Sequence, residues 1–290
     1  MPMMSVGEAV LKSARWLADR EVESARLDAE LLLAKILNGD RLRLYMDWQK
    51  PLTDLEISGY REFIVRRGTN REPVARIIGS RQFYGREFEV TKDTFVPRPE
   101  TEGVVERALM LLEKEPALAN RRQVVFEVGT GTGCIIVSIA AQSDAHDFIA
   151  TDVSAGALAT AHRNAKRHGV DGRIDFRNAA YFDNYHGTLG LIVSNPPYIS
   201  SAEIPTLAPE VKNYDPMPAL DGGADGLDAV RIIAAEGAKL LLHGGWTILE
   251  IGEEQGPGTL ALFTPEAGYS EARIEKDMAG LDRYLLARKG

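Results

Sequence analysis

A glycine-rich loop between an apolar run and a helix-like segment constrains this chain more than any other feature. Residues 124–128 favour a strand, and the sequence Gly-Thr-Gly-Thr-Gly follows at 129–133 without a break. Glycines let the backbone turn sharply and let a ligand approach the main chain, and the start of the next helix presents unpaired N–H groups. The pattern predicts a strand, a ligand-binding loop and a helix.

The rest of the C-terminal part alternates between β-rich and helical segments, which indicates βαβ units around a mostly parallel sheet. Helices are expected near 134–142, 155–168 and 225–242. The predicted strands are 124–128, 148–152, 173–177, 191–194 and 246–251, with a closing pair at 272–277 and 283–287. The expected fold class is therefore α/β.

Two helix starts can be read in the first part of the chain. Ser5 with Glu8 and Thr53 with Glu56 have the spacing of capping boxes ahead of helical apolar periodicity. We therefore expect a small helical domain over residues 1–72.

The pattern becomes shorter and more alternating from 74 to 90, with Gly79 and Gly85 as breaks, which favours a β-hairpin. The predicted domains are a helical domain at 1–72, a β-hairpin linker at 73–98 and a ligand-binding α/β domain at 99–290.

Composition excludes several classes of protein. The single cysteine, Cys134, rules out an internal disulfide framework, and the five histidines form no metal-binding motif, so no metal is expected. We expect Cys134 to pack at a helix start rather than act as a nucleophile. The net charge of -8 argues against a nucleic-acid partner. No apolar run is long enough to span a membrane, which favours a cytoplasmic location.

The glycine loop has an acidic residue on each side. Glu127 stands two residues before Gly129, and Asp152 ends the next predicted strand, where it can accept hydrogen bonds from ribose hydroxyls. The glycine spacing differs from the G-x-G-x-x-G of dinucleotide-binding loops. This difference favours a loop that binds the adenosine part of a methyl donor over one that binds a dinucleotide. A purely structural turn is the alternative.

A second loop, Asn195-Pro196-Pro197-Tyr198, follows the predicted strand at 191–194. An amide nitrogen is a poor nucleophile because its lone pair is delocalised. The side-chain oxygen of Asn195 and the carbonyl of Pro196 can accept both N–H bonds of an NH₂ group and so direct its lone pair. The prolines stiffen the loop, and Tyr198 adds a flat face. A proline-stiffened turn without function is the alternative.

These motifs together resemble the release-factor glutamine methyltransferase family (PrmC/HemK) over nearly the whole chain. Besides the two loops, the resemblance includes Pro97-Arg98-Pro99-Glu100-Thr101-Glu102, close to the family's PRPDTE, then Glu210 and the run from Pro218 to Leu227. It implies a Rossmann-like class I methyltransferase with a seven-stranded sheet. The implied reaction is methylation, by S-adenosyl-L-methionine, of the side-chain nitrogen of the glutamine in the Gly-Gly-Gln motif of peptide-chain release factors.

The resemblance also implies roles for individual residues. Those expected to bind the methyl donor are Glu127, Gly129, Thr130, Gly131, Thr132, Gly133, Asp152, Tyr181 and Asn195. Those expected to hold the substrate are Asn195, Pro196, Pro197 and Tyr198, of which Asn195, Pro196 and Tyr198 are the candidate catalytic residues.

One stretch departs from the family. Many members have an aspartate and then an aromatic residue after the third strand of the sheet, near the adenine, whereas this chain has Ala179-Ala180-Tyr181-Phe182. Tyr181 can still flank the adenine, but the acidic contact is missing. We therefore expect a lower donor affinity than in members with the acid.

Two groups of charged residues have open roles. The arginine-rich stretch at 61–86 is either a solvated surface or a contact for the protein substrate. Arg98 and Glu100 either line the substrate entrance or form an ion pair at the domain crossing.

Three other functions remain as alternatives. A ribosomal-protein glutamine methyltransferase would share both loops. An adenine-N6 methyltransferase would act on an exocyclic amine of nucleic acid whose lone pair is delocalised in the same way. Such an enzyme usually needs a target-recognition region, and none is evident in the sequence. A non-catalytic adaptor could keep the fold without the reaction.

Overall fold

The computed structural model describes residues 4–290, which divide into two compact units. The helical unit comprises the residues up to Ser80 together with Ala208–Tyr214. The sheet unit comprises Arg81–Leu207 and Asp215–Gly290. A short segment from the second half of the chain thus belongs to the helical unit, which the sequence pattern did not indicate.

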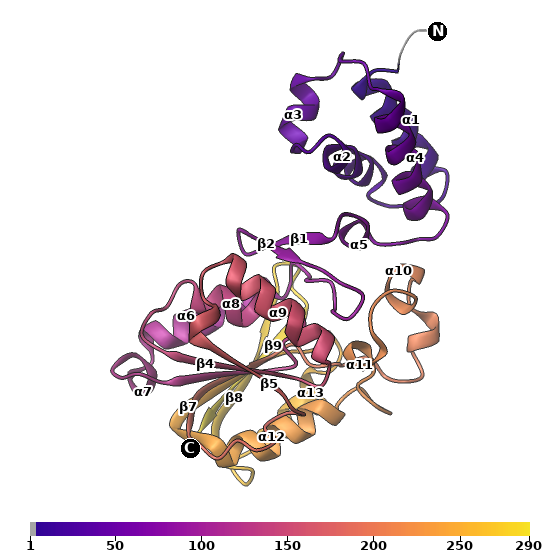
Figure 1. Cartoon of the computed structure of the whole chain (residues 1–290). Helices are drawn as coiled ribbons and strands as arrows, with labels where there is room; N and C mark the ends of the chain where they lie inside the picture. Colours follow the sequence, from indigo (N-terminus) through magenta and orange to yellow (C-terminus); the bar gives the residue numbers. More distant parts are fainter. Residues whose placement is uncertain (1–3) are drawn as a thin grey trace. The chain divides into compact units, whose positions relative to one another are not determined.

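The helical unit is a small bundle (Figure 1). Its helices are α1 (Val6–Ala18), α2 (Ala25–Ile36), α3 (Arg41–Met46), α4 (Asp54–Gly68), α5 (Val74–Ile78) and α10 (Pro209–Lys212). Leu17, Leu32, Leu33 and Ile64 belong to its buried apolar core. Amphipathic helices of this length gain most of their stability from burying such a face.

Both predicted capping boxes are confirmed. The Ser5 hydroxyl accepts a hydrogen bond from the Glu8 amide, and the Glu8 carboxylate accepts one from the Ser5 amide at 3.1 Å. Thr53 and Glu56 form the same reciprocal pair at the start of α4. These bonds satisfy amide groups that have no partner within the helix.

A buried ion-pair cluster holds the 208–214 segment within the helical unit. Arg67 is only 7% exposed, and its Nε donates to Asp28 at 2.7 Å while its Nη1 donates to Glu210 at 2.9 Å. Arg71 pairs with Glu210 at 2.7 Å. Arg66 pairs with Glu72. Both roles considered for the arginine-rich stretch at 61–86, a solvated surface and a contact for the protein substrate, are therefore wrong for Arg67, which serves as an internal partner for two carboxylates.

The predicted hairpin is shorter than expected. Strands β1 (Ser80–Phe83) and β2 (Arg86–Glu89) form it, and the turn residues Tyr84 and Gly85 have φ angles of 49° and 70°. Two positive φ angles match the twist of a two-residue hairpin turn. The expectation that the hairpin starts near residue 74 is wrong: the preceding residues are helix α5, which Pro73 introduces and Gly79, at φ 78°, terminates.

The sheet unit is built on one seven-stranded sheet with the order β5-β4-β3-β6-β7-β9-β8. The first five strands in that order are parallel, and β9 is antiparallel to both of its neighbours. The strands are β3 (Val124–Val128), β4 (Asp147–Asp152), β5 (Ile174–Asn178), β6 (Leu189–Ser194), β7 (Leu241–Glu250), β8 (Tyr269–Lys276) and β9 (Asp282–Lys289). The predicted fold class is confirmed.

Helices cover both faces of this sheet (Figure 1). The α-helices of the unit are α6 (Glu102–Lys114), α7 (Pro116–Ala119), α8 (Cys134–Ala140), α9 (Ala155–Arg167), α11 (Met217–Leu220), α12 (Asp228–Leu240) and α13 (Gly256–Leu260). Side chains alternate along a strand, so Val125 and Val193 join the core beneath α6 and α8, whereas Phe126 and Ile192 join the core with α12. Short 3₁₀ turns lie at Asp171–Arg173 and Ile204–Thr206.

Within residues 4–290, no helix combines the length and the apolar character needed to cross a lipid bilayer.

Candidate active site

The strand order reverses direction between β3 and β6. The chain moves outward from β3 through β4 to β5 and then returns to the other side of β3. The register pairs Val128 with Thr151 on β4 and with Ser194 on β6, and Ser194 in turn with Leu249 on β7. The loops after these strands therefore start at the same level. Open α/β sheets bind their ligands at such a reversal, beyond the carboxyl ends of the strands.

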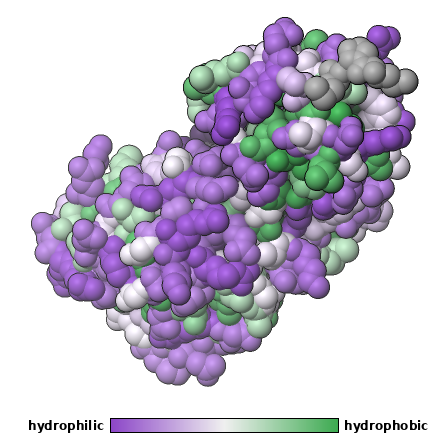
Figure 2. Space-filling model, turned by 45° about the horizontal axis from the view of Figure 1, so that its top comes forward, coloured by the Kyte–Doolittle hydropathy of each residue, from purple (hydrophilic) through white to green (hydrophobic). Residues whose placement is uncertain are grey.

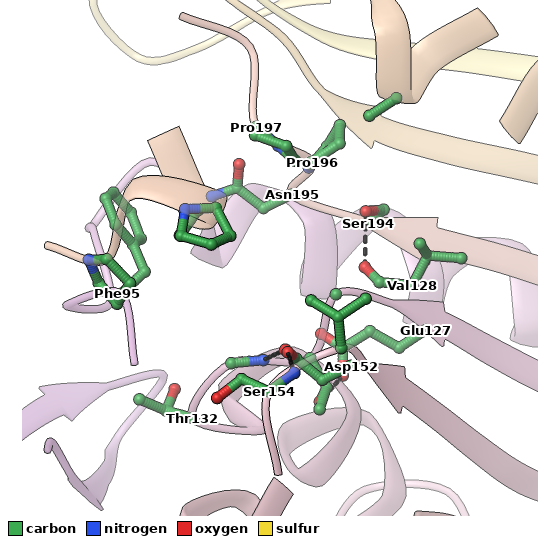
Figure 3. Close-up of a pocket in the computed structure, with 18 of the residues that line it drawn as sticks. Phe95, Glu127, Val128, Thr132, Asp152, Ser154, Ser194, Asn195, Pro196 and Pro197 are labelled. Carbon is green, nitrogen blue, oxygen red and sulfur yellow. Dashed lines mark hydrogen bonds between the residues drawn. The ribbon is translucent and has the colours of Figure 1, made fainter. Parts of the chain in front are cut away.

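A cavity of about 320 Å³ lies at this edge of the sheet unit. Its size is at the lower end of the range for small-molecule sites, about 300 to 1,000 Å³. The predicted site residues that line it are Glu127, Gly129, Thr130, Gly131, Thr132, Asp152, Tyr181, Asn195, Pro196, Pro197 and Tyr198. Figure 3 shows Asn195, Pro196 and Pro197 on one side of the cavity and Asp152 and Ser154 on the other.

The glycine loop, residues 129–133, leaves open space beside the backbone. Gly129 and Gly131 have φ angles of 70° and 55°, and a Cβ atom on either would meet no atom within 4 Å. A ligand can therefore approach the main chain there, as an adenosine-type donor requires. Gly133 differs, since it does not line the cavity and a Cβ there would lie 3.1 Å from Ala161. Gly133 instead allows the start of α8 to pack closely against Ala161.

Asp152 connects the glycine loop to the loop after β4. Its two carboxylate oxygens accept hydrogen bonds from the amides of Gly131 and Ser154, each at 2.9 Å. Burial raises its pKa, although these two bonds act in the opposite direction. A carboxylate has about four acceptor positions. Asp152 can thus hold the loop and still accept hydroxyl groups of a ligand in the cavity.

Glu127 is a buried acid at the end of β3, beneath the glycine loop. The Thr130 hydroxyl donates to its Oε2 at 2.5 Å. Burial raises the pKa of Glu127 to about 8, against the hydrogen bonds from Thr130 and the Ile136 amide. Near neutral pH the free protein therefore holds this carboxyl mainly in its protonated form.

This acid predicts that binding of S-adenosylmethionine releases a proton. The donor is a cation, and a nearby positive charge lowers a carboxyl pKa. Because the pKa of free Glu127 is about 8, donor affinity should rise with pH below that value, by at most about tenfold per pH unit, and level off above it. Calorimetry in two buffers of different ionisation enthalpy measures the proton count. Glu127→Gln should abolish proton release, and a zero count for the unaltered protein at neutral pH would contradict the prediction.

The acceptor loop, residues 195–198, follows β6 directly. The Asn195 side-chain Nδ2 donates to the Thr101 hydroxyl at 3.1 Å. The Ser194 hydroxyl donates to the Val128 carbonyl at 2.7 Å, which fastens the end of β6 to the end of β3 (Figure 3). The position of the loop is therefore fixed from both sides.

The run from Pro218 to Leu227 braces the acceptor loop. Gly222 donates its amide to the Ile199 carbonyl at 2.8 Å. Gly226, at φ 75°, lies so close that a Cβ would be 2.3 Å from the Tyr198 carbonyl oxygen. Gln255 completes the brace, since its Nε2 donates to the Tyr198 carbonyl at 2.8 Å. Sequence alone gave no reason to select Gln255.

Two side chains in the cavity are excluded as bases near neutral pH. Burial raises the pKa of Cys134 to about 12, which agrees with the expectation that it packs at the start of α8. Burial likewise raises the pKa of Tyr198 to about 12. Both groups therefore keep their protons.

Arg98 and Glu100 do not line the cavity. Arg98 pairs with Asp215 at 3.0 Å, and its guanidinium lies 4.9 Å from the centre of the Phe95 ring, which does line it. The Glu100 carbonyl accepts a hydrogen bond from the Tyr284 hydroxyl at 2.6 Å. Arg98 therefore supports a wall of the cavity through Phe95.

The stretch that departs from the family borders the cavity. Ala179 and Tyr181 line it, and Ala180 lies between them. A carboxylate at position 180 can accept a hydrogen bond from the adenine amino group, which has no acidic partner in this chain. We expect Ala180→Asp to lower the KM for S-adenosylmethionine by about twofold to tenfold, the value of one such hydrogen bond. Ala180→Asn offers an acceptor oxygen without a charge, so it shows how much of the effect comes from the hydrogen bond alone. An unchanged KM in Ala180→Asp would contradict the expectation.

Fold, loops and cavity define the protein as a Rossmann-like class I methyltransferase, a class whose methyl donor is S-adenosylmethionine. A solved structure of the catalytic domain of hMettl16 with the MAT2A 3'UTR hairpin 6 shares the fold. Its TM-score is 0.53 at 13% identity, and the match covers 81% of this chain and 82% of that one.

Sequence comparisons identify the family. The model described as PrmC N-terminal domain matches residues 8–79, and the one described as Methyltransferase small domain matches residues 106–210. A release factor glutamine methyltransferase from Geobacter sulfurreducens is 39% identical over 95% of this chain and 93% of its own. Its counterpart from Bradyrhizobium diazoefficiens is 40% identical over 98% of this chain and 96% of its own. This chain belongs to the release factor glutamine methyltransferase family, as the motifs predicted.

Proposed function

We propose that this protein methylates the side-chain nitrogen, N5, of the glutamine in the Gly-Gly-Gln motif of peptide-chain release factors. One observation carries the proposal: a single cavity is lined by an open glycine loop and by a braced loop of oxygen acceptors. The named activity of the full-length relatives supports it.

The two sides of the cavity suit different ligands. Gly129, Gly131 and Asp152 offer open backbone and a carboxylate for the donor, with Tyr181 beside them. When bound, S-adenosylmethionine supplies a methyl group on a positively charged sulfur. Glu127 is the nearby acid that can balance this charge.

The acceptor loop suits a carboxamide. Its two prolines, Pro196 and Pro197, have no N–H and a fixed φ, so the loop presents acceptors on a stiff backbone. Asn195 Oδ1 and the Pro196 carbonyl can each accept one N–H of the glutamine NH₂ group. This grip directs the nitrogen lone pair at the methyl group while the bond from methyl to sulfur breaks, and positioning provides most of the acceleration.

The reaction needs no strong base. Alkylation makes the remaining N–H acidic, so the amide proton can pass to water. The raised pKa values of Cys134 and Tyr198 are compatible with this scheme because neither group has to take a proton.

We further propose that residues 1–72 recognise the release factor, that 73–98 link the domains and that 99–290 carry out the transfer. Figure 2 shows hydrophobic side chains gathered on the surface of the helical unit. Among the exposed apolar residues of that unit, Leu42 is 69% and Met46 is 78% exposed. Exposed apolar groups of this kind mark protein contacts when they lie together.

Transfer of radiolabelled methyl from S-adenosylmethionine tests the function. The acceptors are a purified release factor, the same factor with its Gly-Gly-Gln glutamine changed to alanine, a short Gly-Gly-Gln peptide, ribosomal proteins, DNA and RNA. We expect label on the unaltered release factor but not on its glutamine-to-alanine version, the ribosomal proteins, DNA or RNA. The peptide should also be labelled, with a much higher KM than that of the release factor.

Other outcomes would select a different function. Label on ribosomal proteins or on adenine in nucleic acid would replace the proposal with one of these activities. Absence of donor binding in calorimetry would indicate a non-catalytic adaptor.

A further inference from the structure

A buried carboxyl group lies behind the acceptor loop without lining the cavity. Glu250 ends β7 and is 2% exposed, and its Oε2 has no hydrogen-bond partner among the described residues. Its neighbour Leu249 pairs with Ser194, so Glu250 stands next to Asn195 across the two strands. A buried acid with an unpaired oxygen costs stability unless it serves another purpose.

Thr101 joins this carboxyl group to the acceptor loop. The Thr101 hydroxyl is buried and accepts a hydrogen bond from Asn195 Nδ2 at 3.1 Å. Hydrogen bonding by the side chains of Thr101 and Asn195 lowers the pKa of Glu250, which indicates that both side chains lie beside this carboxyl group. The three side chains thus form one connected group at the back of the loop.

The direction of these bonds depends on the charge of Glu250. An ionised carboxylate can only accept, so Thr101 must donate its single hydrogen to Glu250 and can only accept from Asn195. Asn195 then has to turn its NH₂ toward Thr101 and Glu250, which leaves Oδ1 for the substrate. A protonated Glu250 can instead donate to Thr101, which permits the opposite orientation of the Asn195 amide.

We propose that Glu250, in its ionised form and acting through Thr101, is a positioning residue that keeps the oxygen of the Asn195 amide directed to the substrate amide. The proposal rests on the proposed function, since only a substrate NH₂ needs an acceptor at that place. A reversed Asn195 would present NH₂ to NH₂ and could not grip the substrate.

The surroundings of Glu250 allow it to change charge near neutral pH. Burial raises the pKa of Glu250 to about 7 although Thr101, Arg283 and Asn195 lower it. The charged and titratable groups around it are Glu100 before α6, Cys134 on α8, Tyr198 in the acceptor loop, and Arg283 and Tyr284 on β9.

The effects of these neighbours are distinct. Glu100 raises the pKa of Glu250, and Arg283 keeps its positive charge because its own pKa is raised. The pKa values of Cys134, Tyr198 and Tyr284 are all raised to about 12. Glu127 also has a pKa near this range in the free protein, so the step in kcat that we expect near pH 7 is assigned to Glu250 by its loss in Glu250→Gln.

Three variants test the proposal, with kcat measured at saturating donor and release factor over about pH 6 to 9. Thr101→Val removes the hydroxyl at constant shape, and Thr101→Ser keeps it. We expect Thr101→Val to lower kcat by about 10- to 100-fold, the effect of misplacing a reacting group, and Thr101→Ser to restore most of it. The unaltered protein should gain kcat as pH rises through about 7, and Glu250→Gln should be slower at high pH and lose this rise.

A spectroscopic readout tests the same point without turnover. In ¹⁵N-labelled protein, the side-chain NH₂ signals of Asn195, assigned by their loss in Asn195→Ala, should shift with pH through about 7. They should not shift in Glu250→Met, which fills the site with an apolar side chain of similar size and so preserves folding. Donor binding measured by calorimetry checks that each variant is intact.

The outcomes separate this proposal from the proposed function. Unaltered kcat in Thr101→Val, equal losses in Thr101→Val and Thr101→Ser, or the same pH shift of the Asn195 signals in Glu250→Met would overturn it. If no release factor were methylated, the proposed function would fail, whereas the Asn195 signals would still decide whether Glu250 controls the amide.

Discussion

We expect Asn195→Ala to lower kcat by about 10²- to 10³-fold, the usual loss when one preorganised polar group is removed from an active site. Asn195 lines the cavity and has its amide nitrogen committed to Thr101, so its oxygen is the side-chain acceptor that the loop offers. Alanine removes this acceptor and leaves only the Pro196 carbonyl to hold the substrate NH₂. Single-turnover methyl transfer to a release factor measures the loss.

The same variant should keep most of its donor affinity. The glycine loop and Asp152 remain, so the Kd for S-adenosylmethionine is expected to change by less than about tenfold, which calorimetry can resolve. Asn213→Ala, an exposed asparagine outside the cavity, is the matched control. Turnover of Asn195→Ala within threefold of the unaltered protein would refute the mechanism proposed above.

We expect Arg67→Ala to destabilise the helical unit by about 3 to 5 kcal/mol, the range for removing one partner of a buried ion pair. Arg67 is 7% exposed and serves both Asp28 and Glu210. Alanine leaves the Asp28 carboxylate buried without its cation, while Glu210 keeps Arg71. Hydrogen exchange of the amides in α2 and α4 measures the free energy of opening of this unit by itself.

Arg66→Ala is the control at the neighbouring position. Arg66 pairs with Glu72, and its side chain is 32% exposed, so its removal should cost no more than about 1 kcal/mol. Equal losses in the two variants would show that the buried cluster has no special contribution.

The sequence predicted the sheet unit well because its strands are local apolar runs. The bounds of β3 agree with the prediction, β4 begins one residue earlier than predicted, and β5 is shifted by one residue at both ends. β7 begins at Leu241, five residues before the predicted start. The prediction missed these residues because Gly244 and Gly245 interrupt the apolar pattern. Most of the predicted cavity residues were found because short motifs place them directly after strands, whereas lining residues such as Phe95 and Pro216 were not predicted.

Features that depend on distant partners were missed. Thr101 and Asn195 are separated by 94 positions, and Arg67 and Glu210 by 143. No local periodicity reports such pairs. Glu250 did leave a signal, an acid inside the apolar run 248–251, which is unusual for a buried strand. Helix α5 was missed because it is too short for its periodicity to be distinguished from that of a strand.

The presence of Ala208–Tyr214 in the helical unit limits how the gene can be divided. A fragment that ends at Ser80 would lack Glu210, so Arg67 would lose one of its two carboxylate partners and Arg71 the carboxylate to which it is paired. Conversely, a fragment that starts at Arg81 would expose a stretch of chain whose partners are absent. Swapping the N-terminal part between relatives should therefore succeed only when the later segment is exchanged with it.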